Sequence, residues 1–390
     1  MTATQVVDNQ TVVLQNSLQF MRDEAYTKAK TFLGTLMVGG NPTIDTKTET
    51  FIGQLKWNKP LNHNINVLTL TDPTAGVVTN GAQDFLTYIK TARSTGAEAI
   101  NTAELITQMD SIERISNGFA EAQVQDENGA ITSLLKGIAI SEALIGTQAG
   151  GLGGQTFDNN PESAVNGFYV DLGAETPVVA ASAAVQGAAR ATNFLNALTA
   201  AFKDYEPAFA YLAITPEVFS SLRSANLVDD IGVVDGNITF DTIFQGKFRL
   251  FVTRTNMNMS TAELTALNGG GGVNIVGTKT SFIILPGSIE SEALVMPVPV
   301  EITRNGNAYQ GGGISSIWSR WGYVLAPAGY SWGGSQTVFP ADTHFKQVVR
   351  GGTPVNLDTL TTNQADTATG VWARKATSVL TLGILPVFHA

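Results

Sequence analysis

The sequence "SRWGYVLAPAGYSW" at residues 319–332 concentrates large aromatic side chains on one short stretch. Trp318 precedes it, so three of the five tryptophans of the chain lie between residues 318 and 332. Alternation along "SRWGYVL" predicts a strand, and "PAG" predicts a turn after it. Trp and Tyr offer much contact area at a low cost in side-chain entropy, so this strand and turn require a large surface to pack against.

Two segments before this stretch have helical periodicity. The first begins at Val12, continues for about twenty residues and ends near the glycines at 39–40. The second covers residues 102–127, with Asp110 and Arg114 placed four apart in the stabilising orientation. The sequence "ENGA" at 127–130 predicts a kink or stop, after which a helical pattern resumes.

Extended segments surround these helices. Residues 44–79 alternate and turn like two strands, and such an excursion cannot bury both of its faces by itself. After a helix at 181–203, Thr215 and Pro216 have the residue types of a helix N-cap and first position. Several strands follow. Helices first, with strands mixed in later, indicate an α+β fold rather than a doubly wound parallel sheet.

The composition restricts the class of partner. Only 14% of the residues are charged, and the net charge is −10. A surface with little charge indicates either self-association or a Thr/Asn-rich β-rich binding protein at the cell surface. Tight binding of nucleic acid requires clustered Lys and Arg, which this chain lacks. The chain has no cysteine and no apolar run long enough to span a membrane. From the polar stretch "MTATQVVDNQ" we expect no signal peptide.

The residue types and their spacing indicate no catalytic site. His63, His344 and His389 are far apart in sequence and have no metal-ligand spacing. Ser133 and Lys136 match the SxxK pattern of acyl-enzymes, but the partner motifs of that family are missing. We therefore predict no catalytic residue, no metal ligand and no cofactor, with an enzyme of unrecognised acid/base pairs as the remaining alternative.

Two glycine-rich stretches also fail as phosphate-binding motifs. In "GGVNIVGTKT" from Gly271, Thr278 separates the glycine from the lysine, and a strand rather than a helix follows. The stretch "GGLGGQ" at 150–155 lacks the final glycine of a dinucleotide-binding loop. Neither stretch supports a nucleotide cofactor.

Taken in order, these segments resemble the major capsid protein of tailed bacteriophages, which has the Hong Kong 97-type fold. The resemblance covers most of residues 50–335. Residues 81–100 and those after Ser335 fit it less well and are interpreted as decorations specific to this chain. The stretches that carry the resemblance are "AELITQMDSIERISNGFAEAQ", "AYLAITPEVFSSLRSA", "TIFQGKFRLFVTRTNM" and "EITRNGNAYQGGGISSIWSRWGYVLAPAGYSW".

The resemblance implies an α+β capsid fold with an N-terminal arm, an extended β-hairpin loop, a peripheral domain with a long spine helix, and an axial domain. The implied divisions are the arm (1–43), the extended loop (44–100), the peripheral domain with the spine helix (101–180), the axial domain (181–275), the peripheral strands (276–335) and a C-terminal extension (336–390).

The resemblance also implies a function. The chain would self-assemble into hexamers and pentamers of an icosahedral shell around double-stranded DNA, which it would enclose without binding it tightly. The implied partners are many copies of the chain, with scaffolding, decoration and portal proteins beside them, and no membrane. The location would be the virion, assembled in the cytoplasm of a host bacterium. The alternative is the shell of an encapsulin-type nanocompartment.

In such a shell, the arm, the extended loop and the aromatic strand are expected to meet neighbouring subunits. One face of the strand is predicted to pack on the spine helix, and the other to meet a neighbour or residues 336–390. A core formed entirely within the chain is the alternative. The predicted inter-subunit contact residues are Leu14, Leu18, Met21, Phe51, Trp57, Trp321 and Tyr323.

Overall fold

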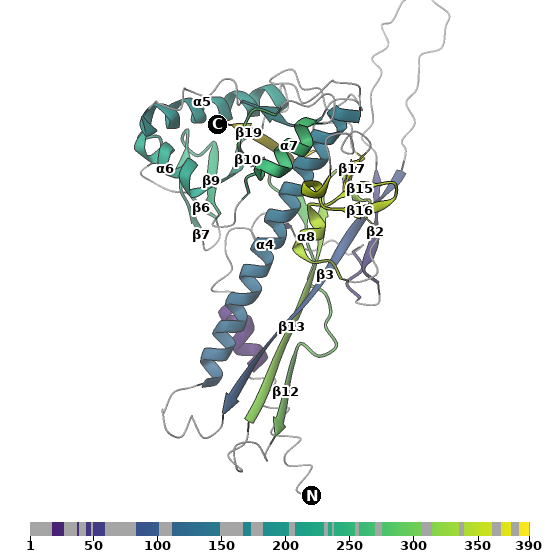
Figure 1. Ribbon diagram of the computed structural model, residues 1–390. Helices are drawn as coiled ribbons and strands as arrows, with labels where there is room; N and C mark the ends of the chain where they lie inside the picture. Colours follow the sequence, from purple (N-terminus) through teal and green to yellow (C-terminus); the bar gives the residue numbers. More distant parts are fainter. Residues whose placement is uncertain are drawn as a thin grey trace, which may run out of the picture.

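The computed structural model has a mixed α+β architecture, which confirms the predicted fold class. Two six-stranded sheets and one long helix form its frame (Figure 1). The structure describes residues 18–26, 37–38, 44–47, 50–58, 83–100, 111–148, 167–172, 182–202, 207–229, 233–235, 238–253, 257–269, 275–305, 314–334, 339–360, 368–375 and 382–389.

The first sheet is built on the aromatic strand. Strand β13 pairs with β3 in antiparallel register, from Ile314 opposite Ile100 to Leu325 opposite Ile89. The order is β1-β11-β13-β3-β2, and β12 pairs with β13 beside this path. Beyond the other strands, β12, β13 and β3 continue as a long ribbon (Figure 1). The strands are β1 (Met37–Val38), β2 (Ile52–Asn58), β3 (Gln83–Ile100), β11 (Ile289–Glu290), β12 (Val300–Asn305) and β13 (Ile314–Pro327).

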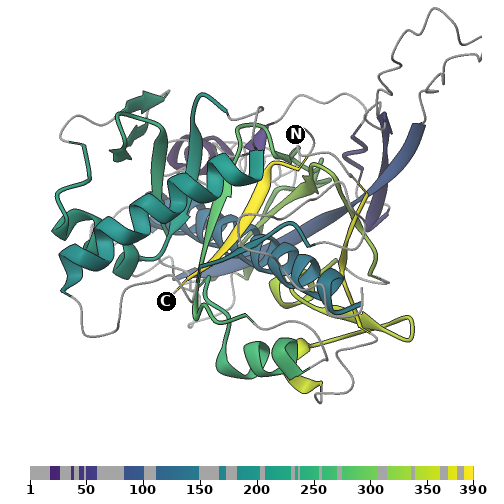
Figure 2. The ribbon, with the colours of Figure 1, turned by 90° about the horizontal axis from the view of Figure 1, so that it is seen from above.

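The second sheet has the order β4-β19-β10-β5-β9-β8. Helix α5 (Ala183–Phe202) packs on it, with the Phe194 ring edge-on to His389 at 5.5 Å. Helices α5 and α6 (Pro216–Ser224) lie at one end of the molecule, and β2 lies at the other (Figure 2). The strands are β4 (Val170–Asp171), β5 (Ala210–Ile214), β8 (Thr242–Ile243), β9 (Phe248–Val252), β10 (Lys279–Ile284) and β19 (Ile384–His389).

Helix α4 (Ser111–Gln148) runs along the ribbon and into the body of the molecule (Figure 1). Almost every side chain between Ala130 and Leu144 is buried, as expected of a helix with protein on all sides. At Gly137 a Cβ atom would lie 1.9 Å from the carbonyl oxygen of Phe345, so the absent side chain lets the C-terminal segment close on the helix. The helix thereby joins both sheets to one core.

Smaller elements complete the described chain. A helical segment over residues 18–26 lies against the lower part of α4 (Figure 1). The others are β6 (Val233–Asp235), β7 (Ile238–Phe240), α7 (Thr261–Gly269), β14 (Tyr330–Trp332), α8 (Asp342–Phe345), β15 (Val348–Arg350), β16 (Thr353–Val355), the 3-10 turn η3 (Leu357–Thr359), β17 (Thr369–Gly370) and β18 (Trp372–Arg374).

The expected break at "ENGA" was wrong, because α4 continues through residues 127–130. The carbonyl of Asn128 accepts a hydrogen bond from Thr132 Oγ1 (2.7 Å). At Gly129 a Cβ atom would lie 2.8 Å from Asp342 Oδ2, so the glycine allows α8 to approach the helix closely. Tertiary packing therefore overrides the weak helix propensity of this stretch.

Two segments that were interpreted as decorations are central. Residues 83–100 form β3, which lies between β13 and β2 in the first sheet. Residues 384–389 form β19, which lies between β10 and β4 in the second sheet, and all its side chains are buried. Apart from these two segments, the domain boundaries that the resemblance implies stay a prediction.

A buried ion pair connects α4 to α7. Lys136 Nζ lies 2.7 Å from Glu263 Oε2, which also accepts a hydrogen bond from the backbone N–H of Ser260 (2.7 Å). Ser260 Oγ in turn accepts from the N–H of Glu263, which completes a capping box on α7. Burial raises the pKa of Glu263, but the hydrogen bonds from Lys136 and Ser260 outweigh it and hold that pKa below its ordinary value.

This pair predicts a loss of stability in acid. Because the folded pKa of Glu263 is lowered, its stabilisation is present above the unfolded pKa and is lost as pH falls through the folded one. At pH 7, Glu263→Gln should cost about 3 kcal/mol, since it leaves Lys136 buried without its carboxylate. Urea unfolding of dissociated subunits at pH 7 and pH 4 measures the difference, which should shrink at pH 4. An equal difference at both pH values would contradict an ionised pair.

Candidate assembly surface

The aromatic strand meets α4 at one carboxylate. Asp126 Oδ2 accepts hydrogen bonds from Trp321 Nε1 (3.0 Å) and the Tyr323 hydroxyl (3.1 Å), and Asp126 Oδ1 accepts from Arg93 Nε (3.0 Å). Arg93, from β3, also reaches Asp342 of α8 at 3.0 Å. Four elements of the chain are thus connected through three charged side chains, those of Arg93, Asp126 and Asp342. The prediction that one face of this strand packs on the long helix is confirmed.

Burial changes the titration of this cluster. It raises the pKa of Tyr323 well above its ordinary value, with the charge of Asp126 adding to the effect, so this phenol remains a neutral donor. Burial also raises the pKa of Asp342, although Arg93 acts in the opposite direction. These shifts accompany a structural network that is satisfied within the chain.

The opposite face of the strand is also covered within the chain along its upper part. Val324 belongs to a cluster with Ile44 and Tyr88, and a Cβ atom at Gly322 would lie 2.4 Å from the Met296 side chain. Trp321 and Tyr323 therefore lie inside the subunit rather than on its surface. Their location favours the alternative of an intrachain core for these two predicted contact residues.

The helical segment at 18–26 also packs on its own chain. Arg22 donates to Ser319 Oγ (3.1 Å), and the Tyr26 hydroxyl donates to the Glu127 carboxylate (2.7 Å). Leu18 is buried in a cluster with Phe119 and Ile317. This part of the predicted arm covers the ribbon and α4 of the same subunit. These contacts favour the alternative of packing within the chain for this segment.

The same segment leaves two large apolar side chains in solvent. Phe20 is 70% exposed and Met21 is 40% exposed. Because the other side of the helix holds Leu18 and Arg22 on the body, these two side chains point away from it. Of the predicted contact residues in the arm, Met21 is therefore placed on the surface. Leu14 lies outside the described residues.

The two predicted contact residues of the hairpin lie near β2. Phe51 packs edge-on against Phe339 at 4.9 Å within the chain. Trp57 lies on β2 opposite Asp84 of β3, and its side chain is not among those described. The structure therefore does not bring the predicted residues together: they lie on the arm, at the base of the hairpin and inside the core.

A buried lysine fixes the chain that precedes β2. Lys90 of β3 is fully buried, and its ammonium donates to Asp45 Oδ2 (2.7 Å) and to the carbonyl of Lys47 (2.7 Å). The hydrogen bond from Lys90 lowers the pKa of Asp45. Asp45 and Lys47 are thus held on β3.

Trp318, the most exposed tryptophan of the ribbon, was not among the predicted contact residues. Trp318 is 44% exposed and lies flat over Gly96 of β3, where a Cβ atom would be 2.8 Å from its ring. Ile317 faces α4, so alternation places Trp318 on the opposite face of the ribbon. The signal was present in the alternation of "SIWSR", because Trp318 shares its face with Arg320 and not with Trp321.

Charged and polar side chains surround this tryptophan. Arg320 Nη2 lies 2.6 Å from Glu301 Oε2 on the neighbouring strand β12. In the pairing of β12 with β13, Glu301 lies directly opposite Trp318. Ser316 Oγ reaches Glu98 Oε1 at 3.5 Å on the other side. An exposed aromatic inside a polar rim is the usual composition of a protein–protein contact. We call this side of β12, β13 and β3 around Trp318 the open face of the ribbon.

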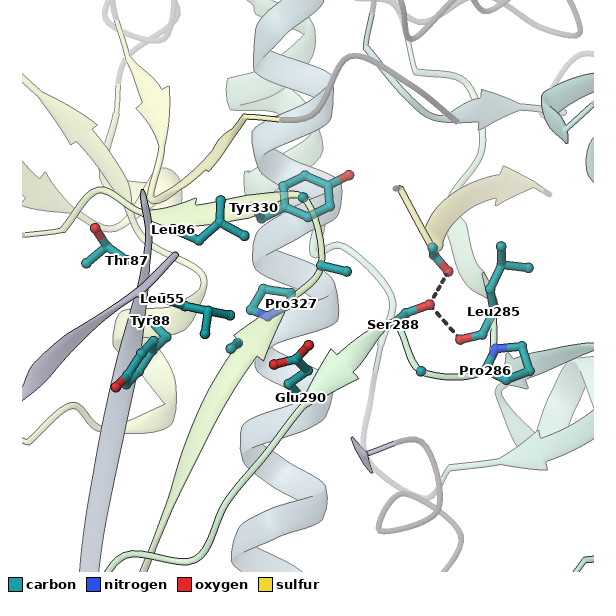
Figure 3. A pocket seen from close by; sticks show the side chains of 15 residues that line it. Leu55, Leu86, Thr87, Tyr88, Leu285, Pro286, Ser288, Glu290, Pro327 and Tyr330 are labelled. Carbon is teal, nitrogen blue, oxygen red and sulfur yellow. Dashed lines mark hydrogen bonds between the residues drawn. The ribbon is translucent and has the colours of Figure 1, made fainter. Parts of the chain in front are cut away.

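The described residues also enclose a pocket of about 290 Å³ where the two sheets meet (Figure 3). Leu55 and Leu86 form one wall, and the turn around Pro286 forms the other. Ser288 Oγ donates at the edge of this turn to the carbonyls of Leu285 (2.5 Å) and Gly383 (3.0 Å). Glu290 is the only charged side chain among the described lining residues.

No group of three or more His, Cys, Asp or Glu able to hold a metal ion occurs among the described residues. No described helix is long and apolar enough to cross a membrane.

Comparison with known proteins gives structural neighbours and no sequence relatives. No protein-family model matches this sequence, and no curated protein is similar to it. The solved structures to which the chain is similar include phage capsids and heads, the class named by the sequence resemblance.

Three of these structures show the extent of the similarity. The capsid of the cyanophage P-SCSP1u has 12% identity and a TM-score of 0.42, with 92% of this chain and 88% of that chain covered. The mature capsid of bacteriophage PhiM1 has 12% identity and a TM-score of 0.43, over 76% and 84%. The head of Helicobacter pylori bacteriophage KHP40 has 9% identity and a TM-score of 0.41, over 91% and 89%.

Proposed function

We propose that the chain is the major capsid protein of a tailed phage, a structural subunit that assembles into a closed icosahedral shell around double-stranded DNA. The observation that carries the proposal is the ribbon of β12, β13 and β3. One of its faces is packed on α4 and residues 18–26, while its open face presents Trp318 to solvent. A long ribbon that the other described residues cover on one face only is better suited to a subunit of an assembly than to a monomer.

Assembly into hexamers and pentamers requires interfaces in which one patch meets a different patch on the next copy. The open face, and the arm residues Phe20 and Met21, are separate surfaces that can take the two sides of such contacts. Among the described strands, β2 ends the order of its sheet, so we expect its outer edge to pair with a strand of a neighbour. Main-chain pairing tolerates the small changes of angle that distinguish pentamers from hexamers.

The two sheets suggest how the subunit divides into parts. We assign the first sheet, α4 and the ribbon to the peripheral part of the subunit, and the second sheet with α5 and α6 to the axial part. Strand β10, which the implied boundaries place with the peripheral strands, then belongs to the axial part because it pairs with β5. Strand β19 joins it there.

The chain would act as a wall and not as an enzyme. A net charge of −10 favours a wall that encloses DNA without binding it tightly. Scaffolding, decoration and portal proteins, and assembly in a bacterial cytoplasm, belong to the same proposal. The encapsulin-type alternative shares the shell but not the cargo, and the phage capsids named above do not favour it.

Electron microscopy of the purified chain tests the proposal. We expect closed, regular shells or rings of five and six subunits, and DNA rather than protein as the cargo of shells from infected cells. A protein cargo would select the encapsulin alternative. A monomer that persists at high concentration would reject both.

Trp318→Ala should separate assembly from folding. Because an aromatic anchor inside a polar rim carries much of an interface, the concentration needed for shells should rise on the order of tenfold or more. The unfolding free energy of the dissociated subunit should change by about 1 kcal/mol or less, since Trp318 lies on the surface. Sedimentation measures the first quantity and urea unfolding the second.

The matched control is Trp321→Ala, three residues away on the covered face. It removes a buried ring and the hydrogen bond to Asp126, so it should cost the subunit about 3–5 kcal/mol. Equal effects of the two substitutions on stability would show that Trp318 is a core residue, and the open face would lose its role.

A further inference from the structure

The turn between β8 and β9 has an uncommon backbone. Phe244, Gln245 and Gly246 have φ angles of 54°, 56° and 87°, all in the left-handed region. Glycine adopts this region freely and Asn tolerates it, but for a bulky aromatic residue it is an outlier. Such outliers persist only where the surroundings enforce them, and they concentrate at sites with a function.

The surroundings do enforce this turn. Asp229 Oδ2 accepts hydrogen bonds from Thr242 Oγ1 (2.7 Å) and from the N–H of Gly246 (3.3 Å). The N–H of Lys247 donates back to the carbonyl of Phe244 (3.2 Å). Lys247 Nζ is itself held on the carbonyl of Pro207 at 2.6 Å. Hydrogen bonds therefore hold both ends of the turn in place.

The result of this geometry is an aromatic ring on the surface. Phe244 is 36% exposed, whereas Phe248, whose ring lies 6.4 Å away, is fully buried. If Phe244 served the core, it would be expected to be covered like Phe248. The next residue, Gln245, is exposed and uncharged. A partner that covers Phe244 and Gln245 therefore takes no charged side chain of these two residues out of water.

We propose that Phe244 is a contact side chain that the β8–β9 turn presents to a second copy of the chain. The inference rests on the proposed function and adds a contact at another place. Strand β9 lies near α6, at the far end of the molecule from β12 and the open face of the ribbon (Figure 1). A nucleic acid is disfavoured as the partner by the net charge of −10, while aromatic side chains are enriched where proteins meet.

Phe244→Asn tests the proposal, because strain relief and contact loss act in opposite directions. Asn is tolerated at positive φ, so the melting temperature of the dissociated subunit should not fall. The concentration at which shells form should rise at least fivefold, because the ring is gone. Light scattering across a concentration series and thermal unfolding by circular dichroism give the two readouts.

The matched control is Gln245→Gly, which relieves the backbone strain at residue 245 and retains the ring of Phe244. It should raise the melting temperature and leave the assembly concentration within twofold of that of the unmodified chain. Unchanged assembly of Phe244→Asn would overturn this inference alone. A lowered melting temperature with a proportionate loss of shells would also overturn it, by making Phe244 a folding residue. Absence of any self-association by the unmodified chain would overturn the proposed function as well.

Discussion

A chain that ends at Gly383 is expected not to fold. The truncation removes β19, which pairs with β10 from Lys279 opposite His389 to Ile284 opposite Ile384. It also removes several large side chains that are buried in the main core. Each such side chain contributes about 2–5 kcal/mol, so the summed loss, on the order of 10 kcal/mol, is comparable to the whole stability of a domain. The buried apolar side chains lost are Ile384, Leu385, Val387 and Phe388.

Circular dichroism and limited proteolysis of the expressed truncation measure the outcome. We expect insoluble or protease-sensitive protein and no shells. The control in the same C-terminal region is Thr353→Ala, which alters an exposed position of β16 and should leave folding and assembly unchanged. A soluble, protease-resistant truncation would show that β19 is dispensable and would restore the interpretation of this segment as a decoration.

Strand β19 could not be assigned from its sequence because Pro386 argues against an inner strand. The structure shows why the proline is tolerated. The N–H of Leu285 donates to the carbonyl of Gly383, so alternation makes Phe282 and Pro386 a non-hydrogen-bonded pair. The proline nitrogen then faces the other side, where β4 begins its pairing only at Val387. No ladder hydrogen bond is lost.

Other elements were recognisable to different degrees. The α+β class, the helix ending near residue 202 and the aromatic strand could be predicted, because their periodicities are set by burial. Strand β3 was not predicted because Lys90, Thr91 and Arg93 break the apolar alternation. Their hydrogen-bond partners come from segments distant in sequence, and these partners allow the three polar side chains to lie within the fold. The continuity of α4 depended on Gly129 and Asp342, which are distant in sequence.

The candidate contact residues illustrate a further limit. Periodicity separates the two faces of a strand but does not say which face meets another copy. Trp321 and Tyr323 were selected for their size, yet both are satisfied by Asp126 inside the subunit. Trp318, on the other face, has the exposure that a contact requires. The number of polar partners available within the chain distinguishes the two cases, and only the structure supplies it.

Asp126→Ala, a substitution on α4, is expected to destabilise the subunit about as much as Trp321→Ala does. It removes the common acceptor of Trp321, Tyr323 and Arg93. Two buried donors lose their carboxylate acceptor, and Arg93 keeps Asp342 and the carbonyl of Ala92. The Arg93–Asp126 pair is only partly buried, but each buried donor left without its acceptor costs about 1–3 kcal/mol. Urea unfolding followed by tryptophan fluorescence should therefore show a loss of about 3–5 kcal/mol.

Comparison with two other substitutions on α4 locates the origin of this loss. Glu121→Ala removes an exposed carboxylate from the same helix and should change the unfolding free energy by about 0.5 kcal/mol or less. Asp126→Asn retains an acceptor but no charge, so it should fall between the two. Because Asp126 also holds the ribbon on α4, Asp126→Ala should impair shells even at temperatures where the subunit remains folded. If Asp126→Ala were as stable as Glu121→Ala, the ribbon would be held by apolar packing alone, and the hydrogen-bonded cluster would have no structural role.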